Sequence, residues 1–157
     1  MNDSDDPGGA SSRPGFPSGP ATVALADEQS VSVDCDALMR AAHSALDALA
    51  MRGELSIALV DAATIAELKG QYYGEHAATD VLSFPMDGPA GPTIGDVVIC
   101  PQVAARQARG LGLTLDQEMR QLVVHGIVHL AGRDHVTPRD EVSMAADERR
   151  IIAGVGA

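Results

Sequence analysis

Residues 119–135 read MRQLVVHGIVHLAGRDH, and they contain both the most apolar helix of the chain and its candidate site. Apolar residues fill most positions from Met119 to Leu130, which predicts a helix that is buried on most sides. Thr114 or Asp116 is a suitable N-cap, and Gly132 fits the position just beyond the last turn. We therefore expect this helix to lie at the centre of the fold.

Three of the five histidines of the chain, His125, His129 and His135, fall in this stretch. Residues four apart lie on one face of a helix, so the first two imidazoles can share one cation, and the turn at Gly132 lets the third arrive from the loop. Three imidazoles with one open position form the donor set of a catalytic zinc site, whereas structural sites usually have four protein ligands. The sequence predicts one Zn²⁺ per chain, with a water that the ion makes more acidic.

The spacing HxxxHxxGxxH resembles the HExxHxxGxxH pattern of the metzincin peptidases, and it predicts a metzincin-like zinc-binding helix. Gly126 stands here in place of the Glu that acts as the general base of peptide hydrolysis. A metallopeptidase is therefore an alternative that this position disfavours. Glycine inside a helix costs about 1 kcal/mol relative to alanine, so we expect it to serve a close backbone approach or to leave room over the metal.

The remaining pattern predicts one small sheet with several helices. We expect a helix between Asp34 or Asp36 and Gly53, a helix from Asp61 that Gly70 ends, and further helices that begin at Pro101 and near Pro138. Alternating or apolar runs predict strands at residues 21–26, 54–60, 80–84 and 94–100. This order favours a mixed α/β or α+β domain.

Composition limits the class of protein further. The chain has 157 residues, so we expect one domain over residues 21–157 and a disordered tail over residues 1–20, which are rich in Gly, Pro and Ser. It has no apolar run long enough for a bilayer and no signal peptide, so we expect a cytoplasmic protein with no membrane contact, in which Cys35 and Cys100 stay reduced. A net charge of −11, no Trp, and only two Tyr and two Phe argue against bulk electrostatic binding of nucleic acid and against a base-stacking platform.

Three segments together resemble the YbeY family. HGIVHLAGRDH at residues 125–135 is similar to the family signature HGxLHLxGYDH, TDVLSFP at 79–85 to PT(D/N)VLSFP, and GDVVIC at 95–100 to GDIVIC. Met144 and Glu148 lie where the family has a short M…E helix. The resemblance covers about residues 22–153 in the family's order.

This resemblance implies an α+β fold with a four-stranded mixed sheet and a zinc ion held by His125, His129 and His135. It also implies a zinc-dependent, single-strand-specific endoribonuclease that matures the 3′ end of 16S rRNA and acts in ribosome quality control. The implied partners are single-stranded rRNA and the small ribosomal subunit with its assembly factors. A ribosome-assembly factor without enzymatic activity, in which the zinc is structural, is the second alternative.

Two positions depart from the family pattern. Tyr73, before Gly74, stands where many relatives carry an arginine that is implicated in activity, and Arg133 stands where the signature has a tyrosine. Our hypothesis is that Arg133 supplies the missing cationic contact to a phosphate, because a guanidinium can bind phosphate bidentately. A solvated loop arginine is the alternative. Asp134 could orient an imidazole or act as a base, or could merely cap the end of the helix.

Overall fold

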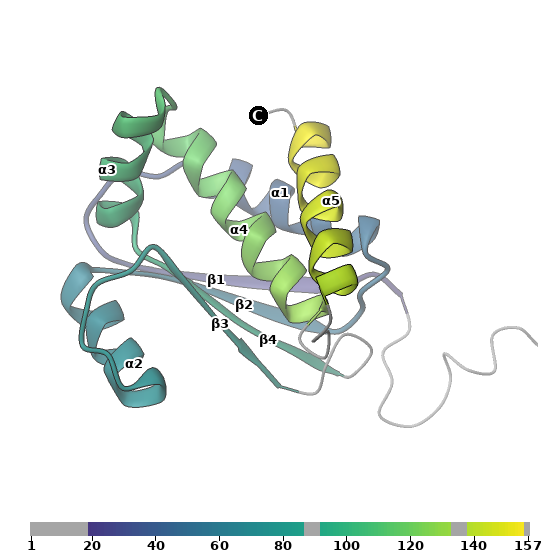
Figure 1. Cartoon of the computed structure of the whole chain (residues 1–157), viewed down its shortest axis with the longest axis horizontal. Helices are drawn as coiled ribbons and strands as arrows, with labels where there is room; N and C mark the ends of the chain where they lie inside the picture. Colours follow the sequence, from purple (N-terminus) through teal and green to yellow (C-terminus); the bar gives the residue numbers. More distant parts are fainter. Residues whose placement is uncertain (1–18, 87–91, 133–137, 156–157) are drawn as a thin grey trace, which may run out of the picture.

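A computed structural model describes residues 19–86, 92–132 and 138–155 of the chain. Four strands form one mixed sheet in the order β1-β2-β4-β3 (Figure 1). β1, β2 and β4 are parallel to one another, and β3 is an edge strand that runs antiparallel to β4. The strands are β1 (Thr22–Glu28), β2 (Glu54–Val60), β3 (Val81–Pro85) and β4 (Thr93–Ile99).

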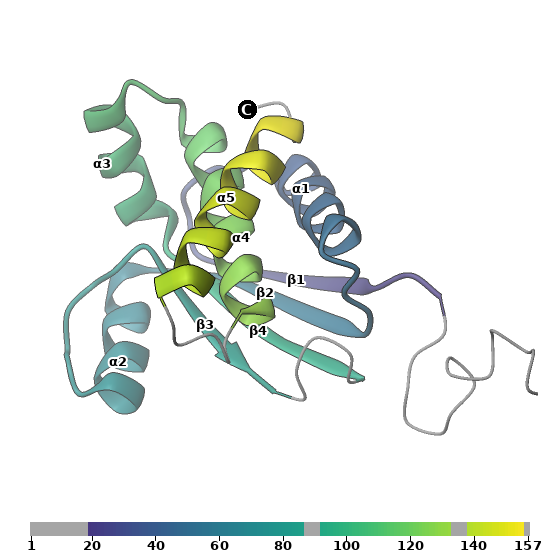
Figure 2. The same cartoon turned by 45° about the vertical axis from the view of Figure 1, so that its right-hand side comes forward.

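The helices cover the two faces of this sheet unequally. α1, α4 and α5 lie over one face, with α3 beside α4, whereas α2 lies against the other face (Figures 1 and 2). Their bounds are α1 (Cys35–Ala48), α2 (Ala62–Tyr73), α3 (Pro101–Leu111), α4 (Leu115–Ala131) and α5 (Pro138–Gly154). The predicted α+β class with a four-stranded mixed sheet is therefore confirmed.

Two apolar clusters form the core, one on each face of the sheet. The larger cluster joins the strands to α1 and α4, and it contains Leu46, Leu55 and Ile127, which are all fully buried. The smaller cluster holds α2 against the opposite face through Ile65 and Val98. α4 contributes nine buried residues, in agreement with the prediction of a central helix.

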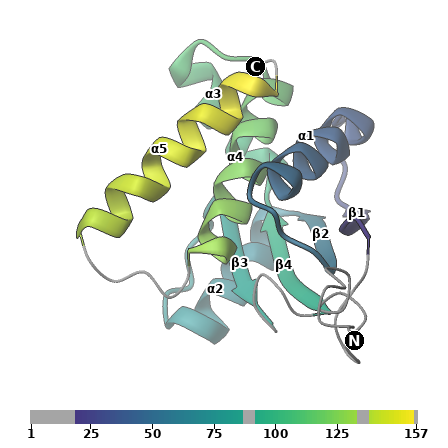
Figure 3. The same ribbon diagram turned by 90° about the vertical axis from the view of Figure 1, so that its right-hand side faces the viewer.

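α4 lies very close to the sheet at Gly126. A methyl group added to this residue would lie 2.9 Å from Cγ1 of Val97 in β4 and 3.2 Å from Oγ of Ser83 in β3. The Ser83 hydroxyl donates a hydrogen bond to the Gly126 carbonyl oxygen (3.1 Å). Figure 3 shows α4 descending between α5 and α1 onto the strands. Of the two reasons expected for a glycine here, the structure supports the close backbone approach.

The caps of the helices mostly agree with the sequence. Asp34 caps α1 by accepting from the Ala37 amide, and Thr114 caps α4 in a capping box with Gln117. The prediction that Gly70 ends α2 is wrong, because the helix continues to Tyr73. The ring of His76 packs over Gly70, where a side chain would collide with it. The helix ends instead at Gly74, whose φ of 79° is in the left-handed region that favours glycine.

Gly132 also differs from its expected role. It caps α4, but its φ of −104° is not left-handed. The sulfur of Met144 in α5 lies against it, so here too the small residue permits close packing.

Cys35 and Cys100 are free thiols. None of the helices in the described ranges is long and apolar enough to cross a membrane, and residues 1–18 of the predicted tail lie outside those ranges.

A buried carboxylate lies between α3 and α4. Glu118 is 5% exposed, although glutamate side chains are seldom fully buried in proteins. With its amide nitrogen turned toward them, Gln107 donates to Glu118 Oε2 (3.0 Å) and to Asp80 Oδ2 (3.1 Å). Burial raises the pKa of Glu118 above its usual 4.5, and the Asp80 carboxylate raises it further.

We expect Gly126→Ala to lower the free energy of unfolding by about 1–3 kcal/mol, because its methyl group overpacks the contact between α4 and β4. Gly110→Ala in α3 is the control, since a methyl group there has no atom within 4 Å. It should stabilise the protein by up to about 1 kcal/mol through helix propensity. Urea unfolding measures both changes, and a Gly126→Ala variant at least as stable as the wild type would contradict this packing.

We expect Glu118→Gln to be more stable than the wild type at neutral pH. Because its pKa is raised, Glu118 binds a proton more tightly in the folded protein than in the unfolded chain. The stabilisation that this bound proton contributes is lost as pH rises from 4.5 through the raised pKa. The difference in unfolding free energy between variant and wild type should therefore grow from pH 4.5 to pH 7. Urea unfolding across this range checks it, and a difference that shrinks as pH rises would refute the assignment.

Candidate metal centre

Two of the predicted zinc ligands come together on α4. The ring centroids of His125 and His129 lie 4.3 Å apart, with their planes tilted by 55°. Both lie in the last two turns of the helix, on either side of the contact at Gly126 that holds α4 to the sheet. The packing of the backbone therefore fixes where both rings stand.

A carboxylate from a different helix holds the first ring. Both oxygens of Glu148 in α5 lie 3.0 Å from Nδ1 of His125. An ionised carboxylate only accepts hydrogen bonds, so in the neutral ring Nδ1 carries the proton and Nε2 keeps its lone pair. The His125 side chain is 40% exposed, so the ring is held by Glu148 yet open to solvent.

The second ring is kept in its neutral form. Partial burial lowers the pKa of His129 below its usual 6.5, and the neighbouring His125 lowers it further. Glu148 acts in the opposite direction but is the smaller influence. A neutral imidazole is the form that binds a metal ion.

These features fit a zinc ion. A metal-binding histidine almost always donates its second ring N–H to a carboxylate, a carbonyl or water, as His125 does to Glu148. Within the part of the chain that the structure describes, no group of three or more His, Cys, Asp or Glu side chains is arranged to hold a metal. The third predicted ligand, His135, and the predicted catalytic residues Arg133 and Asp134 all lie in residues 133–137, outside the described ranges.

Sequence reasoning placed Glu148 in a family motif but not in the site. The available signal was the spacing of Met144 and Glu148, which puts both on one face of α5. That face meets α4, with Met144 against Gly132 and Glu148 against His125. When a packing residue and a carboxylate lie four positions apart on a helix, the carboxylate can thus be a residue that orients a metal ligand.

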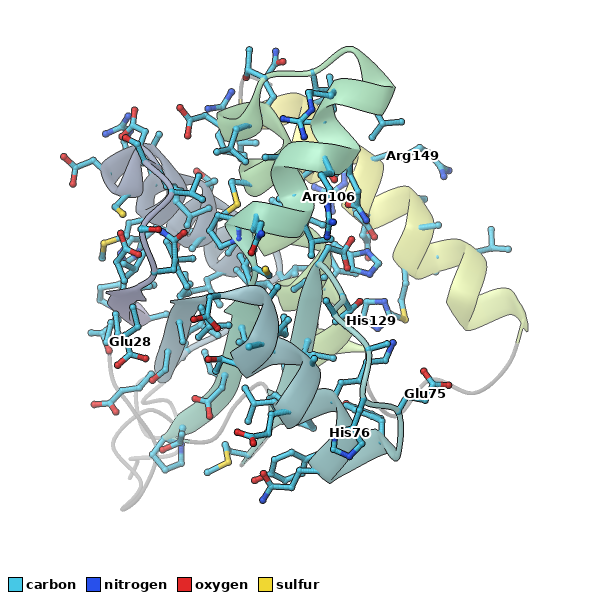
Figure 4. The ribbon with its side chains drawn as sticks, turned by 90° about the vertical axis from the view of Figure 1, so that its left-hand side faces the viewer. Glu28, Glu75, His76, Arg106, His129 and Arg149 are labelled. Atoms are coloured by element: carbon cyan, nitrogen blue, oxygen red, sulfur yellow. The ribbon has the colours of Figure 1, made fainter. Side chains whose placement is uncertain are left out.

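Other polar residues near α4 and β3 differ in what they contact. Ser83 borders the site, since it binds the Gly126 carbonyl. Asp80 has a structural contact at the start of β3, where its carboxylate accepts a hydrogen bond from the Val81 amide (2.7 Å). His43 lies in α1 and is not part of the pair. His76 lies over α2, on the side of the molecule that also carries His129 (Figure 4).

Tyr73, at the position of the family arginine, contacts β3, which also contacts α4. Its hydroxyl donates to the backbone oxygen of Ser83 (3.4 Å), and its ring centroid is 6.2 Å from that of Phe84. The Tyr72 ring also contacts Phe84, with a centroid distance of 5.0 Å. Although the chain has few aromatic residues, three of them therefore lie together in one cluster.

Fold and site together define an α+β protein with a helix-borne histidine pair suited to a divalent metal. The family model described as Endoribonuclease YbeY matches residues 24–156. Endoribonuclease YbeY of Salinispora tropica is 40% identical over 148 residues, which cover 84% of this chain and 94% of the relative. Endoribonuclease YbeY of Thermobifida fusca is 42% identical over 144 residues, which cover 85% of this chain and 93% of the relative.

A solved structure shares the fold. The solution structure of TM1509 from Thermotoga maritima superposes with a TM-score of 0.63 at 24% identity, over 85% of this chain and 88% of that one. The length and identity of the sequence matches establish the family, in agreement with the resemblance found in the sequence. The chain belongs to the endoribonuclease YbeY family.

We expect metal-free His125 to occupy the tautomer with its proton on Nδ1, because Glu148 accepts there. Glu148→Ala should produce a mixture of the two neutral tautomers, and ¹⁵N chemical shifts of the ring at alkaline pH measure their ratio. Asp147→Ala is the matched control, since Asp147 pairs instead with the exposed Arg150 (3.2 Å). Predominance of the Nε2–H form in the wild type would show that Glu148 does not orient this ring.

Proposed function

We propose that this chain is a zinc-dependent endoribonuclease that cleaves single-stranded RNA. In the cell, we propose that it matures the 3′ end of 16S rRNA, acts in ribosome quality control, and works in the cytoplasm with the small ribosomal subunit and its assembly factors. The observation that carries the proposal is the His125–His129 pair with Glu148 behind it, in a chain of the endoribonuclease YbeY family.

In this proposal His125, His129 and His135 hold the zinc. When bound, zinc supplies a Lewis acid for a phosphoryl oxygen and a water of lowered pKa. Glu148 holds the His125 proton on Nδ1 and so keeps Nε2 available as a ligand atom. The lowered pKa of His129 keeps that ring unprotonated at neutral pH.

Two exposed cations support a phosphate substrate. Arg106 of α3 and Arg149 of α5 lie on the side of the molecule that carries His129 (Figure 4). Guanidinium groups bind phosphate through charge-assisted hydrogen bonds. In a chain of net charge −11, such local contacts would serve a phosphodiester better than the overall field of the protein does.

The geometry counts against a peptidase. The peptidase pattern requires a glutamate at position 126 as the general base. Val97 and Ser83 leave no room there even for a methyl group without a shift of the packing. The contact between α4 and the sheet therefore leaves no space for a general base at this position.

We expect purified protein to bind about one zinc per chain and to cut a single-stranded RNA oligomer, while leaving casein and the same RNA in a duplex intact. His129→Ala should remain folded, lose the zinc, and cut RNA about a hundredfold more slowly or worse. His43→Ala, with an exposed histidine in α1, is the matched control and should behave as the wild type.

Metal analysis, thermal unfolding and a cleavage time course measure these outcomes. Cleavage of casein would favour the peptidase alternative. Bound zinc without cleavage of any RNA, together with intact rRNA processing in cells that carry His129→Ala, would favour an assembly factor with a structural metal. Either result would overturn the proposed activity.

A further inference from the structure

Most of the aromatic side chains of this protein gather on one surface. The chain has only two Tyr and two Phe, and Tyr72, Tyr73 and Phe84 form one cluster. The two tyrosines come from the last turn of α2, and Phe84 from the edge strand β3. We call these three residues the aromatic surface.

The two tyrosines are open to solvent. Tyr72 is 61% exposed and Tyr73 is 56% exposed, which places them among the most exposed large apolar residues described. Phe84 is partly buried, packs on the smaller core cluster and supports both rings. The rings are thus held against a partner while part of their surface stays available, so a planar ligand can stack at little conformational cost.

Ser83 connects the aromatic surface to the candidate metal centre. Its backbone oxygen accepts from the Tyr73 hydroxyl (3.4 Å), and its side-chain hydroxyl donates to the backbone oxygen of Gly126 (3.1 Å). Gly126 directly follows His125 in α4. A single residue therefore touches both the aromatic surface and the helix that carries the histidine pair.

We propose that the aromatic surface stacks a nucleobase of the RNA chain and so positions the neighbouring phosphodiester at the metal centre. This inference rests on the proposed function and adds a substrate subsite to it. Every base offers a π-face, and an aromatic side chain contributes substantially to single-strand binding by stacking on it. Stacking needs no positive charge, which suits a chain of net charge −11.

The same contact accounts for selection of single strands. In a duplex each base is stacked between its neighbours and paired, so its face is not available to Tyr72 or Tyr73. In a single strand the bases can be splayed out and stacked on aromatic side chains. Strand selectivity would then come from base stacking as well as from access to the metal.

The test is steady-state cleavage of a single-stranded RNA oligomer by Tyr72→Ala and Tyr73→Ala. We expect KM to rise about five- to a hundredfold, with kcat changed less than twofold, because the base contact is made in both the ground state and the transition state. Tyr72→Phe and Tyr73→Phe keep the ring and should stay within about twofold of the wild type. Leu111→Ala, at a 64% exposed apolar residue at the end of α3, is the matched surface control.

Oligomers with a single abasic nucleotide test the same contact without altering the protein. At the stacked position, the abasic change should raise KM for the wild type but cause no further rise for the alanine variant, as a double-mutant cycle for a direct contact requires. An unchanged KM in the alanine variants, an equal loss in the phenylalanine variants, or additive abasic effects at every position would each overturn the stacking surface. If the wild type cuts RNA but the tyrosine variants behave like it, only the stacking surface is refuted. If the wild type cuts no RNA at all, the proposed function itself is refuted.

Discussion

The close contact between α4 and the sheet at Gly126 is the constraint on which the site depends. Without a side chain at this position, the helix backbone can approach Val97, and the Ser83 hydroxyl can reach the Gly126 carbonyl. Both histidines stand within three residues of this contact, so their positions follow from the packing of the core. The same contact leaves no room for a glutamate at position 126 and so separates this site from a peptidase site of similar spacing.

A second helix completes the arrangement. α5 packs on α4 through Met144 against Gly132, and Glu148 reaches the Nδ1 atom of His125. The carboxylate fixes one ring by hydrogen bonding, whereas partial burial lowers the pKa of the other ring. A zinc ion binds an imidazole through a ring nitrogen that carries no proton. Hydrogen bonding to Glu148 orients one ring, and partial burial favours the neutral form of the other.

Sequence patterns captured the features that depend on local chemistry. The strand at 54–60, the Asp34 and Thr114 caps and the apolar helix around His125 all follow from periodicity and capping, and the structure bears them out. The errors arose where a tertiary contact decided the outcome. Gly70 was expected to end a helix, but it lies beneath the His76 ring, and this packing is not visible in a local pattern. The contact of Glu148 with His125 and the cluster around Phe84 were missed for the same reason, since the partners are separated in the chain.

Anomalous diffraction at the zinc edge from crystals of the zinc-loaded protein tests the central claim most directly. If His125 and His129 form the metal centre in the orientation that Glu148 dictates, one anomalous peak will lie about 2.0–2.1 Å from Nε2 of each ring, with Glu148 still bonded to Nδ1 of His125. A peak on Nδ1 of His125 that displaces Glu148, or a zinc ion bound away from the pair, would contradict the account.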